Sequence, residues 1–230
     1  MSDLATRYRD LLAAIAAAAQ AAKPPRTVRL LAVSKSQPAA ALRGLYALGQ
    51  RQFGENYAQE MLLKAAELSD LTDLELVFIG RIQSNKIAAI VRVAAAVQSL
   101  ASERHARLLA AAVASVGKTP YPVHLLINAA GEASKDGLSG EAAQGLARTI
   151  AAELPELRLR GVMAIPPPLS QLQLGDDGRG VPRLFRQLRL LADSIGEGDL
   201  SLGMSADLQP AILAGSNCVR VGTALFGERR

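Results

Sequence analysis

The sequence is poor in the residue types that stabilise small or metal-dependent proteins. It contains one cysteine, Cys218, no tryptophan and two histidines among 230 residues. A single cysteine excludes an internal disulfide, and a structural zinc site is not expected from one thiolate and two imidazoles. Aromatic residues make up 3% of the chain and hydrophobic residues 50%. The core must therefore be built from alanine, leucine, valine and isoleucine, and the chain is long enough to bury a substantial one.

The chain also lacks the pattern of a nucleic-acid-binding surface. Its net charge of +5 would suit an anionic partner. The basic residues are scattered singly, however, and are not interleaved with aromatic side chains that could stack on bases. We interpret them as solvated surface charges with an anion pocket among them, and we expect no nucleic-acid partner.

Long apolar runs are missing as well. Residues 11–22 follow two arginines, as the apolar part of a signal peptide would, but Asp3 and Asp10 interrupt the would-be positive region. The run is far too short to span a bilayer, so an alanine-rich helix over 3–22 is the better interpretation. We expect a cytoplasmic protein without a membrane partner.

The most informative stretch that is present covers residues 30–35. Apolar residues run without alternation and are followed by Ser34 and Lys35, and Pro38 then opens a helical pattern. Such a run is typical of a strand buried on both faces of a parallel sheet. Lys35 would lie at the carboxyl end of this strand, where α/β proteins keep their chemistry. There it could act as a nucleophile toward aldehydes, or simply begin an exposed loop.

Strands and helices alternate about eight times without a composition shift that would mark a linker. The predicted strands cover 28–34, 51–53, 74–79, 94–98, 121–128, 160–165, 199–202 and 217–221. The predicted helices cover 3–22, 38–48, 57–68, a segment from about 85, 102–116, 140–153, 182–195 and 206–214. Asn56 is a candidate N-cap for the third of these, and Ser102-Glu103 begins the fifth.

Regular alternation of this kind predicts parallel strands joined by crossover helices, and eight such units close into an α/β fold, the (β/α)8 TIM-like barrel. We expect a single domain over 1–230, with the extra N-terminal helix (1–24) packed outside the barrel. An open doubly wound sheet is the alternative, but no G-x-G-x-x-G follows the first strand to support nucleotide binding.

Two glycine-containing turns follow the last two predicted strands. Gly203-Met204-Ser205 comes after 199–202, and Gly222-Thr223 comes after 217–221. In a barrel these strands adjoin the first one, and the loops after strands seven and eight commonly form a phosphate site. Glycine lets the backbone approach an anion, and Ser205 and Thr223 add hydroxyl groups. Each turn alone is compatible with an ordinary helix cap, yet the pair flanks the strand that ends in lysine.

Arg220 is the third part of this predicted site. It alternates with Val219 and Val221, so its side chain should share a face with Gly222 and point into the barrel mouth. A charge there needs a partner, for which an anion or an aromatic nitrogen is suited; a surface arginine on a misassigned strand is the alternative. An aldehyde-reactive lysine, a phosphate cradle and an inward cation together describe a site for pyridoxal 5′-phosphate (PLP).

At these residues the chain resembles the pyridoxal phosphate homeostasis protein family, whose barrel is similar to the N-terminal domain of bacterial alanine racemases. The resemblance runs from about residue 28 to residue 227. It rests on AVSK (32–35), RQFGENYAQE (51–60), FIGRIQSNK (78–86), SKDG (134–137), RGVMAIP (160–166) and LSLGMSADLQPAILAGSNCVRVGTALFG (200–227). No single motif is specific for this family, but the combination of all of them is.

The resemblance implies a Schiff base between PLP and Lys35. It implies that Arg220 faces the pyridine nitrogen and that the other site residues hold the phosphate (Ser205, Gly222 and Thr223) or line the pocket (Asn56 and Met204). It further implies a protein that carries or buffers PLP in vitamin B6 and amino-acid homeostasis without established catalysis. Apo forms of PLP enzymes are candidate partners, and we expect a monomer or a weak dimer.

Four positions bear on how far this resemblance extends. The family often has a second lysine two residues after the Schiff-base lysine, where this chain has Gln37, and a histidine where this chain has Val77. Gln37 puts any cofactor-transfer role of that second lysine in doubt. Lys86 and Lys135 match family lysines, and each could equally be a cap partner or a solvated charge.

Two enzymatic alternatives are weaker. Racemases of the similar fold take a second acid/base tyrosine from an added β-domain, which is not expected here because the chain ends at Arg230, and they have a phosphate-binding tyrosine where this chain has Ala39. A cation at the pyridine nitrogen would also weaken the cofactor as an electron sink. The second alternative, a cofactor-free aldolase acting through Lys35, lacks a carboxylate partner beside the lysine. We therefore predict a PLP-binding protein rather than an enzyme, with a PLP-dependent racemase as the alternative.

Overall fold

The computed structural model describes residues 3–131, 136–175, 178 and 180–227. Its strands form a closed, all-parallel barrel in which each strand pairs with its neighbours in sequence order and the last pairs with the first. The strands are β1 (Arg29–Val33), β2 (Gln52–Glu55), β3 (Glu75–Phe78), β4 (Ala94–Leu100), β5 (Tyr121–Ile127), β6 (Leu157–Ala164), β7 (Asp199–Ser201) and β8 (Cys218–Val221). The predicted (β/α)8 barrel is confirmed, and the open doubly wound sheet is excluded.

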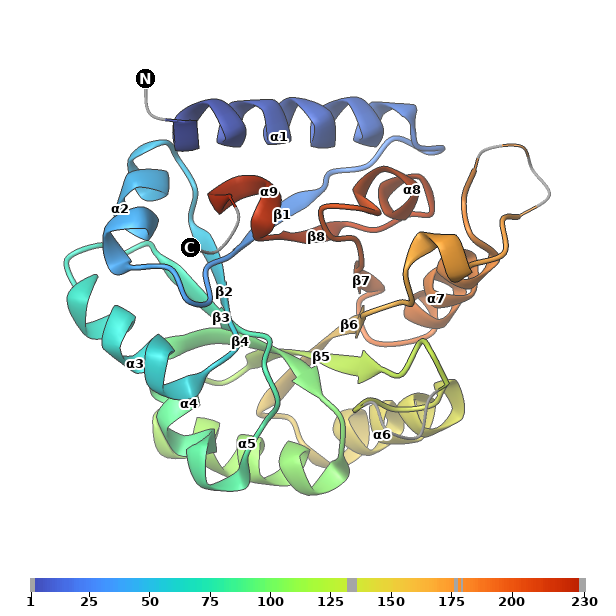
Figure 1. The fold of residues 1–230 in the computed structure, drawn as a ribbon. Coiled ribbons are helices and arrows are strands. Elements are labelled where there is room, and N and C mark those ends of the chain that lie inside the picture. The colour runs from blue at the N-terminus through green and yellow to red at the C-terminus, as the bar shows by residue number, and fades with distance from the viewer. Residues whose placement is uncertain (1–2, 132–135, 176–177, 179, 228–230) are drawn as a thin grey trace.

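The helices lie outside the strands and surround them (Figure 1). They are α1 (Asp3–Ala21), α2 (Ala39–Ala47), α3 (Ala58–Glu67), α4 (Ile87–Val93), α5 (Glu103–Ser115), α6 (Gly140–Glu153), α7 (Arg183–Asp193), α8 (Leu208–Leu213) and α9 (Thr223–Phe226). Two short 3₁₀ turns, Ser84–Lys86 and Leu169–Gln171, complete the described elements.

Alternating side chains divide the core into two parts. Residues of one face of each strand, such as Ala32 and Val219, pack outward against the helices in one large cluster. Residues of the other face meet inside the barrel, where Leu31, Val77 and Cys218 form a small separate cluster. This alternation decides which side chains at the strand ends can reach the barrel mouth.

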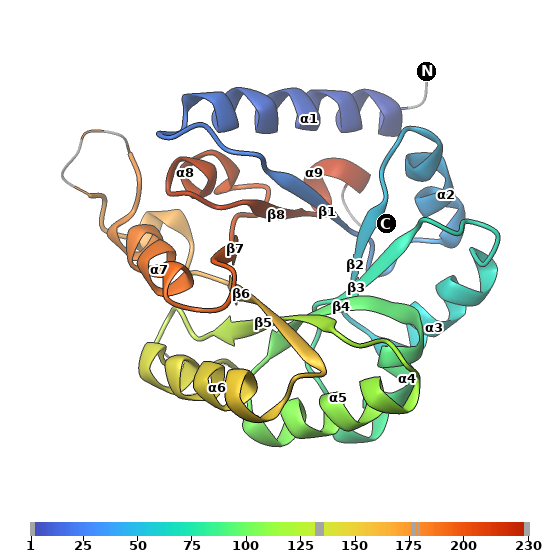
Figure 2. The same ribbon diagram turned by 180° about the vertical axis from the view of Figure 1, so that it is seen from behind.

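Helix α1 lies across the seam where the barrel closes. It packs beside α8 and α9, and both views show it running along them (Figures 1 and 2). The Arg7 Nε donates a hydrogen bond to the Leu225 carbonyl oxygen at 2.8 Å, and the Tyr8 hydroxyl contacts Gln50 Oε1 at 3.3 Å. The first described helix is thus tied to the last one.

Several element boundaries differ from the sequence prediction. Strand β6 begins at Leu157, three residues before the predicted start at 160, because residues 157–159 already pair with β5 ahead of a register shift. Asn56 is not the N-cap of α3: Tyr57 holds that position, without a side-chain cap. Helix α5 begins at Glu103, one residue after the predicted start, and Ser102 is its N-cap, its hydroxyl accepting from the His105 amide at 3.2 Å. Within the described ranges, no helix combines the length and apolar character needed to cross a membrane.

Candidate functional site

Lys35 follows β1 at the carboxyl end of the barrel. Ala32 pairs with Val221 of β8 and Val33 with Gly54 of β2, so the chain leaves β1 between the exits of those two strands. Lys35 continues the alternation of Leu31, whose side chain is inside the barrel, and it is half-buried. This alternation predicts that its amine faces the barrel mouth rather than the helices.

Arg220 points into the barrel, as its alternation in β8 predicts, and is 4% exposed. One terminal nitrogen donates to the Ser201 carbonyl and hydroxyl oxygens at 2.6 and 2.9 Å, and the other donates to the Ala164 carbonyl at 2.7 Å. Burial lowers the pKa of the guanidinium, which nevertheless stays a cation because arginine does not lose its proton in proteins. The Ser201 hydroxyl donates in turn to Gln98 Oε1 at 2.8 Å, so this inner network fixes the cation in place.

The two predicted phosphate turns lie against one another. The Ala224 amide donates to Ser205 Oγ at 3.3 Å, and the Arg220 amide donates to the Gly203 carbonyl at 2.9 Å. A Cβ atom at Gly222 would lie 3.2 Å from the Val33 carbonyl oxygen, so glycine lets this turn approach the end of β1 closely. Ser205 and Thr223 are exposed and open to a ligand. The helix after the first turn begins at Leu208, two residues later than predicted, and Asp207 Oδ1 accepts from the Met204 amide at 2.6 Å.

Asn56 follows β2 on the other side of Lys35. Its Oδ1 atom is buried and has no hydrogen-bond partner among the described residues, which suits a side chain that receives a ligand. Asn56 lines a cavity of about 400 Å³ that extends across the mouth toward Ser99 and Met163. A second cavity of about 400 Å³, on the outer rim, lies between Asn56 and Lys86.

The predicted site residues are therefore grouped at the exits of adjoining strands. Lys35 follows β1, Asn56 follows β2, Met204 and Ser205 follow β7, and Arg220, Gly222 and Thr223 belong to β8 and its exit. Met204 is 37% exposed at the rim. Lys86 follows β3 and lines the outer-rim cavity together with Asn56, and Lys135 lies outside the described residues.

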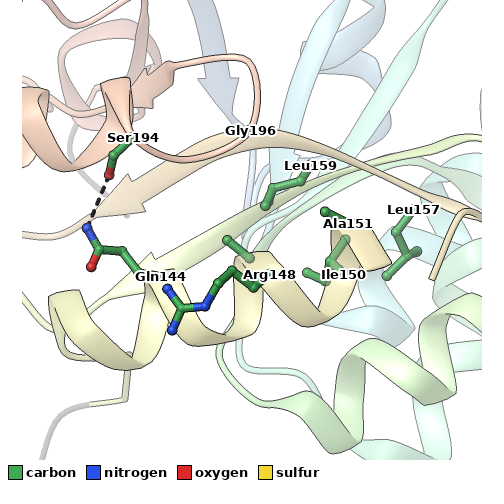
Figure 3. A pocket seen from close by; sticks show the side chains of 9 residues that line it. Gln144, Arg148, Ile150, Ala151, Leu157, Leu159, Ser194 and Gly196 are labelled. Carbon is green, nitrogen blue, oxygen red and sulfur yellow. Dashed lines mark hydrogen bonds between the residues drawn. The ribbon is translucent and has the colours of Figure 1, made fainter. Parts of the chain in front are cut away.

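A cavity of about 580 Å³ has a different location (Figure 3). It lies outside the barrel between α6, the start of β6 and the turn after α7, and Gln144 Nε2 donates to the Ser194 hydroxyl at one side of it at 3.4 Å. Leu157 and Leu159 at its wall are among the first residues of β6, so it is near the amino-terminal end of the barrel. It is remote from Lys35 and offers little titratable chemistry.

A polar cluster inside the amino-terminal end of the barrel was not predicted. Asp199 Oδ2 accepts from Arg29 at 2.6 Å and from Arg160 at 3.1 Å, and His124 Nε2 lies 3.6 Å away. Burial by itself would raise the pKa of Asp199, but the contact with His124 and the two guanidinium charges outweigh it and hold that pKa below its usual range. Burial lowers the pKa of His124. His124 is thus a core residue, at the opposite end of the barrel from Lys35.

Two other features of the site also escaped prediction. Ser201 and Gln98, which hold Arg220, were not singled out, although the alternation of Asp199 and Ser201 on β7 could have indicated that both face inward. A buried cluster behind Lys35, formed by Ser34, Glu55, Glu60 and Lys64, joins two strands to α3. No sequence pattern signals it, because its members come together only in the folded barrel.

Comparison with known proteins agrees with this fold. The family model described as "Alanine racemase, N-terminal domain" matches residues 9–230. The pyridoxal phosphate homeostasis protein of Pseudomonas aeruginosa is 46% identical, over 100% of this chain and 97% of its own length. PipY of Synechococcus elongatus, solved with PLP bound, is 32% identical with a TM-score of 0.80, over 98% of this chain and 100% of that one. An alanine racemase from Bartonella henselae is 14% identical with a TM-score of 0.72, over 98% of this chain and 58% of that one, and shares the fold.

These matches define the class first: the chain is a barrel of the alanine racemase N-terminal domain type. Within that class, the chain belongs to the pyridoxal phosphate homeostasis protein family. The identity extends over the full chain, so the motifs on which the sequence resemblance was based are part of a continuous relationship.

Proposed function

We propose that this protein binds PLP at the carboxyl end of the barrel through Lys35 and carries or buffers the cofactor without turning over a substrate. The observation that carries the proposal is the grouping of Lys35, the buried Arg220 and two contacting turns at the exits of β1, β7 and β8. The PLP-bound structure of PipY, a 32% identical protein, supports the choice of ligand.

The residues present fit this cofactor. PLP has a phosphate, an aromatic nitrogen and an aldehyde, and the site offers a different group for each. The exposed Ser205 hydroxyl and the backbone around Gly222 suit the phosphate, because Gly222 keeps that turn close to the end of β1. The unpartnered Oδ1 of Asn56 is available on the remaining side.

Lys35 supplies the covalent attachment. When bound, PLP supplies an aldehyde that condenses with a primary amine. Lys35 would supply that amine, and its two amine hydrogens would leave with the aldehyde oxygen as water. The same step in reverse, with water as the co-reactant, releases the cofactor, as a carrier requires.

Arg220 argues for binding rather than catalysis. A guanidinium held by carbonyl oxygens of Ser201 and Ala164 can only donate hydrogen bonds, so a ring nitrogen facing it stays unprotonated. An unprotonated ring accepts less charge from a reacting substrate than one paired with a carboxylate. The proposal also includes release of PLP to apo forms of PLP enzymes. Ser205 and Thr223 at the rim are exposed, so an enzyme that accepts the cofactor can approach the barrel mouth.

Borohydride reduction of the PLP-loaded protein is expected to fix the pyridoxyl group on the peptide that contains Lys35. The reason is that Lys35 continues the inward face of β1, whereas Lys86 lies on the outer rim. Peptide mass mapping measures the position directly. Lys35→Ala should abolish trapping and Lys86→Ala should not; a pyridoxyl group found wholly on Lys86 or Lys135 would contradict the assignment.

The loaded protein is also expected to show no racemase or transaminase turnover above that of free PLP. Racemisation needs a proton-transfer group on each face of the substrate, and each missing group reduces the rate by roughly 10²–10⁴. His124 is at the far end of the barrel, and His105 is in α5 with its ring 3.2 Å from Ser84. Incubation with L-alanine and other L-amino acids, followed by chiral chromatography, tests this. Sustained turnover that disappears in Lys35→Ala would show that the protein is a PLP-dependent enzyme.

A further inference from the structure

Directly behind Lys35, on the outer side of the barrel, lies the cluster of Ser34, Glu55, Glu60 and Lys64. Because side chains alternate along β1 and its extension, Ser34 points toward α3 while Lys35 points toward the mouth. Glu55 at the end of β2 is fully buried, and Lys64 of α3 is 4% exposed. A carboxylate and an ammonium group are thus shielded from water, and both contact Ser34, the residue before the proposed attachment site.

The Lys64 ammonium group has three N–H donors, and each has an oxygen acceptor within hydrogen-bond distance. It lies 2.6 Å from each of the Ser34 carbonyl oxygen, Glu55 Oε1 and Glu60 Oε1. The Ser34 hydroxyl also donates to Glu55 Oε1, at 2.6 Å. Lys64 therefore binds the backbone at Ser34 directly and holds both carboxylates beside it.

The cluster also holds the residue on the other side of Lys35. The Ser36 amide donates to Glu60 Oε1 at 2.6 Å, and Ser36 has a φ of 62°. Among the described residues it is the one non-glycine residue with a positive φ. A serine keeps this sparsely populated conformation only where its surroundings enforce it, and such positions tend to occur at functional sites. Both backbone neighbours of Lys35 are thus fixed by one buried cluster.

Stability alone does not account for this arrangement. A buried ion pair is often replaceable by apolar side chains of similar volume without loss of stability, so its presence calls for another reason. Lys118 shows how the same chain uses a lysine for structure only: its ammonium group binds the carbonyl oxygens of Val91 and Arg92 at 2.9 and 2.8 Å, without a carboxylate, far from the mouth.

We propose that Lys64, through Glu55 and Glu60, is a positioning group that sets the backbone on both sides of Lys35 and so aims its amine into the mouth. This inference rests on the proposed function, because the cluster is proposed to position Lys35 for its covalent attachment to PLP.

The test compares the rate of covalent PLP attachment in Lys64→Met with that in the unsubstituted protein and in Lys118→Met. Borohydride added at successive times measures the trapped fraction, and absorbance spectra at a series of pH values follow the bound chromophore. Misplacing a reacting group by about 1 Å can reduce a rate by as much as about 10²-fold, so we expect attachment to slow by about tenfold or more in Lys64→Met. The pH at which the bound chromophore changes colour should also shift, whereas Lys118→Met should match the unsubstituted protein in both readouts.

A double variant separates positioning from folding. Lys64→Met leaves two carboxylates without their cation, so its melting temperature should fall, whereas Lys64→Met with Glu55→Gln removes the fully buried charge and should recover most of that loss. The double variant still lacks the contacts to the Ser34 carbonyl and to Glu60, so its attachment rate should remain as slow as that of the single variant. If attachment recovers together with the melting temperature, the cluster is structural and the inference is overturned.

The two proposals fail in different ways. If the unsubstituted protein takes up no reducible PLP, the proposed function is wrong and the positioning role is wrong with it. If the unsubstituted protein is trapped on Lys35 and both Lys64 variants are trapped at the same rate, the proposed function stands and the positioning role alone is overturned.

Discussion

Replacing Asp199 with asparagine is expected to lower the free energy of unfolding by about 3 kcal/mol at pH 7. This is the lower end of the range for breaking a buried ion pair, because the two partners keep some exposure. Asp199 is 6% exposed, and it accepts from Arg29, Arg160 and the Asn217 amide group. Asparagine retains the size of the side chain but leaves the Arg29 guanidinium without its carboxylate partner, whereas Arg160 keeps Glu197 at 3.1 Å.

The loss of unfolding free energy caused by Asp199→Asn should depend on pH in a defined direction. The pKa of Asp199 is lowered in the folded chain, so the ionised carboxylate contributes stability that is fully present above its unfolded pKa of about 3.9. That contribution is lost as the pH falls below this value toward the lower pKa of the folded state. The difference in the free energy of unfolding between the unsubstituted protein and Asp199→Asn should therefore be constant from about pH 5 to about pH 7. It should shrink below about pH 3.9.

Urea unfolding at several pH values measures this difference, and Asp70→Asn is a matched control. Asp70 also pairs with an arginine, Arg43, but both side chains are exposed, so its replacement should leave the free energy of unfolding nearly unchanged. If Asp199→Asn behaved like Asp70→Asn at neutral pH, the cluster would not act as a buried ion-pair network.

A second large effect is expected from Gly80→Ala. A Cβ atom at position 80 would lie 1.8 Å from the Asn56 carbonyl oxygen and 2.7 Å from its Cα, so backbone must move. Overpacking against rigid backbone should lower the free energy of unfolding by about 3 kcal/mol or more. At about 2–4 °C per kcal/mol for a chain of this size, the melting temperature should fall by roughly 6–12 °C.

The same substitution should weaken PLP binding, because the displaced backbone carries Asn56. Calorimetry on the apo protein and titration with PLP followed by absorbance measure the two effects. Gly145→Ala is the control: it lies in α6, and the nearest atom to its Cβ would be the Arg148 guanidinium at 3.9 Å. There alanine should be neutral or stabilising by up to about 1 kcal/mol. An unchanged melting temperature in Gly80→Ala would show that the loops after β2 and β3 can separate freely.

The sequence was a good guide wherever one local pattern decided the structure. The unbroken apolar run before Lys35 identified β1, and the alternation around Arg220 identified its inward direction. The adjacency of the two turns followed from the closure of the barrel, since strands seven and eight must adjoin strand one. The hydrogen bond from the Ala224 amide to the Ser205 hydroxyl shows that the two turns are in contact.

Prediction was poor where two distant segments decide the role of a residue together. Asn56 has the chemistry of an N-cap, but the close approach of Gly80 to its backbone is not visible in the local sequence, and its Oδ1 is buried instead. Glu55 lies beyond the predicted strand at 51–53, whereas in the structure it ends β2 and is a buried partner of Lys64 from the next helix. The early start of β6 depends on pairing with β5, which single-strand patterning does not register.

The contact of α1 with α8 and α9 has a consequence for the order in which the chain is completed during synthesis. Helix α1 leaves the ribosome before the barrel strands, while its packing partners α8 and α9 leave after seven of them, so its apolar side chains, including Tyr8 and Ile15, stay uncovered until most of the barrel has been made. The pairing of β1 with β8 waits for the same moment. A nascent chain that stops before β8 therefore exposes both an open strand edge and an apolar helix face, the two features that promote aggregation and chaperone capture.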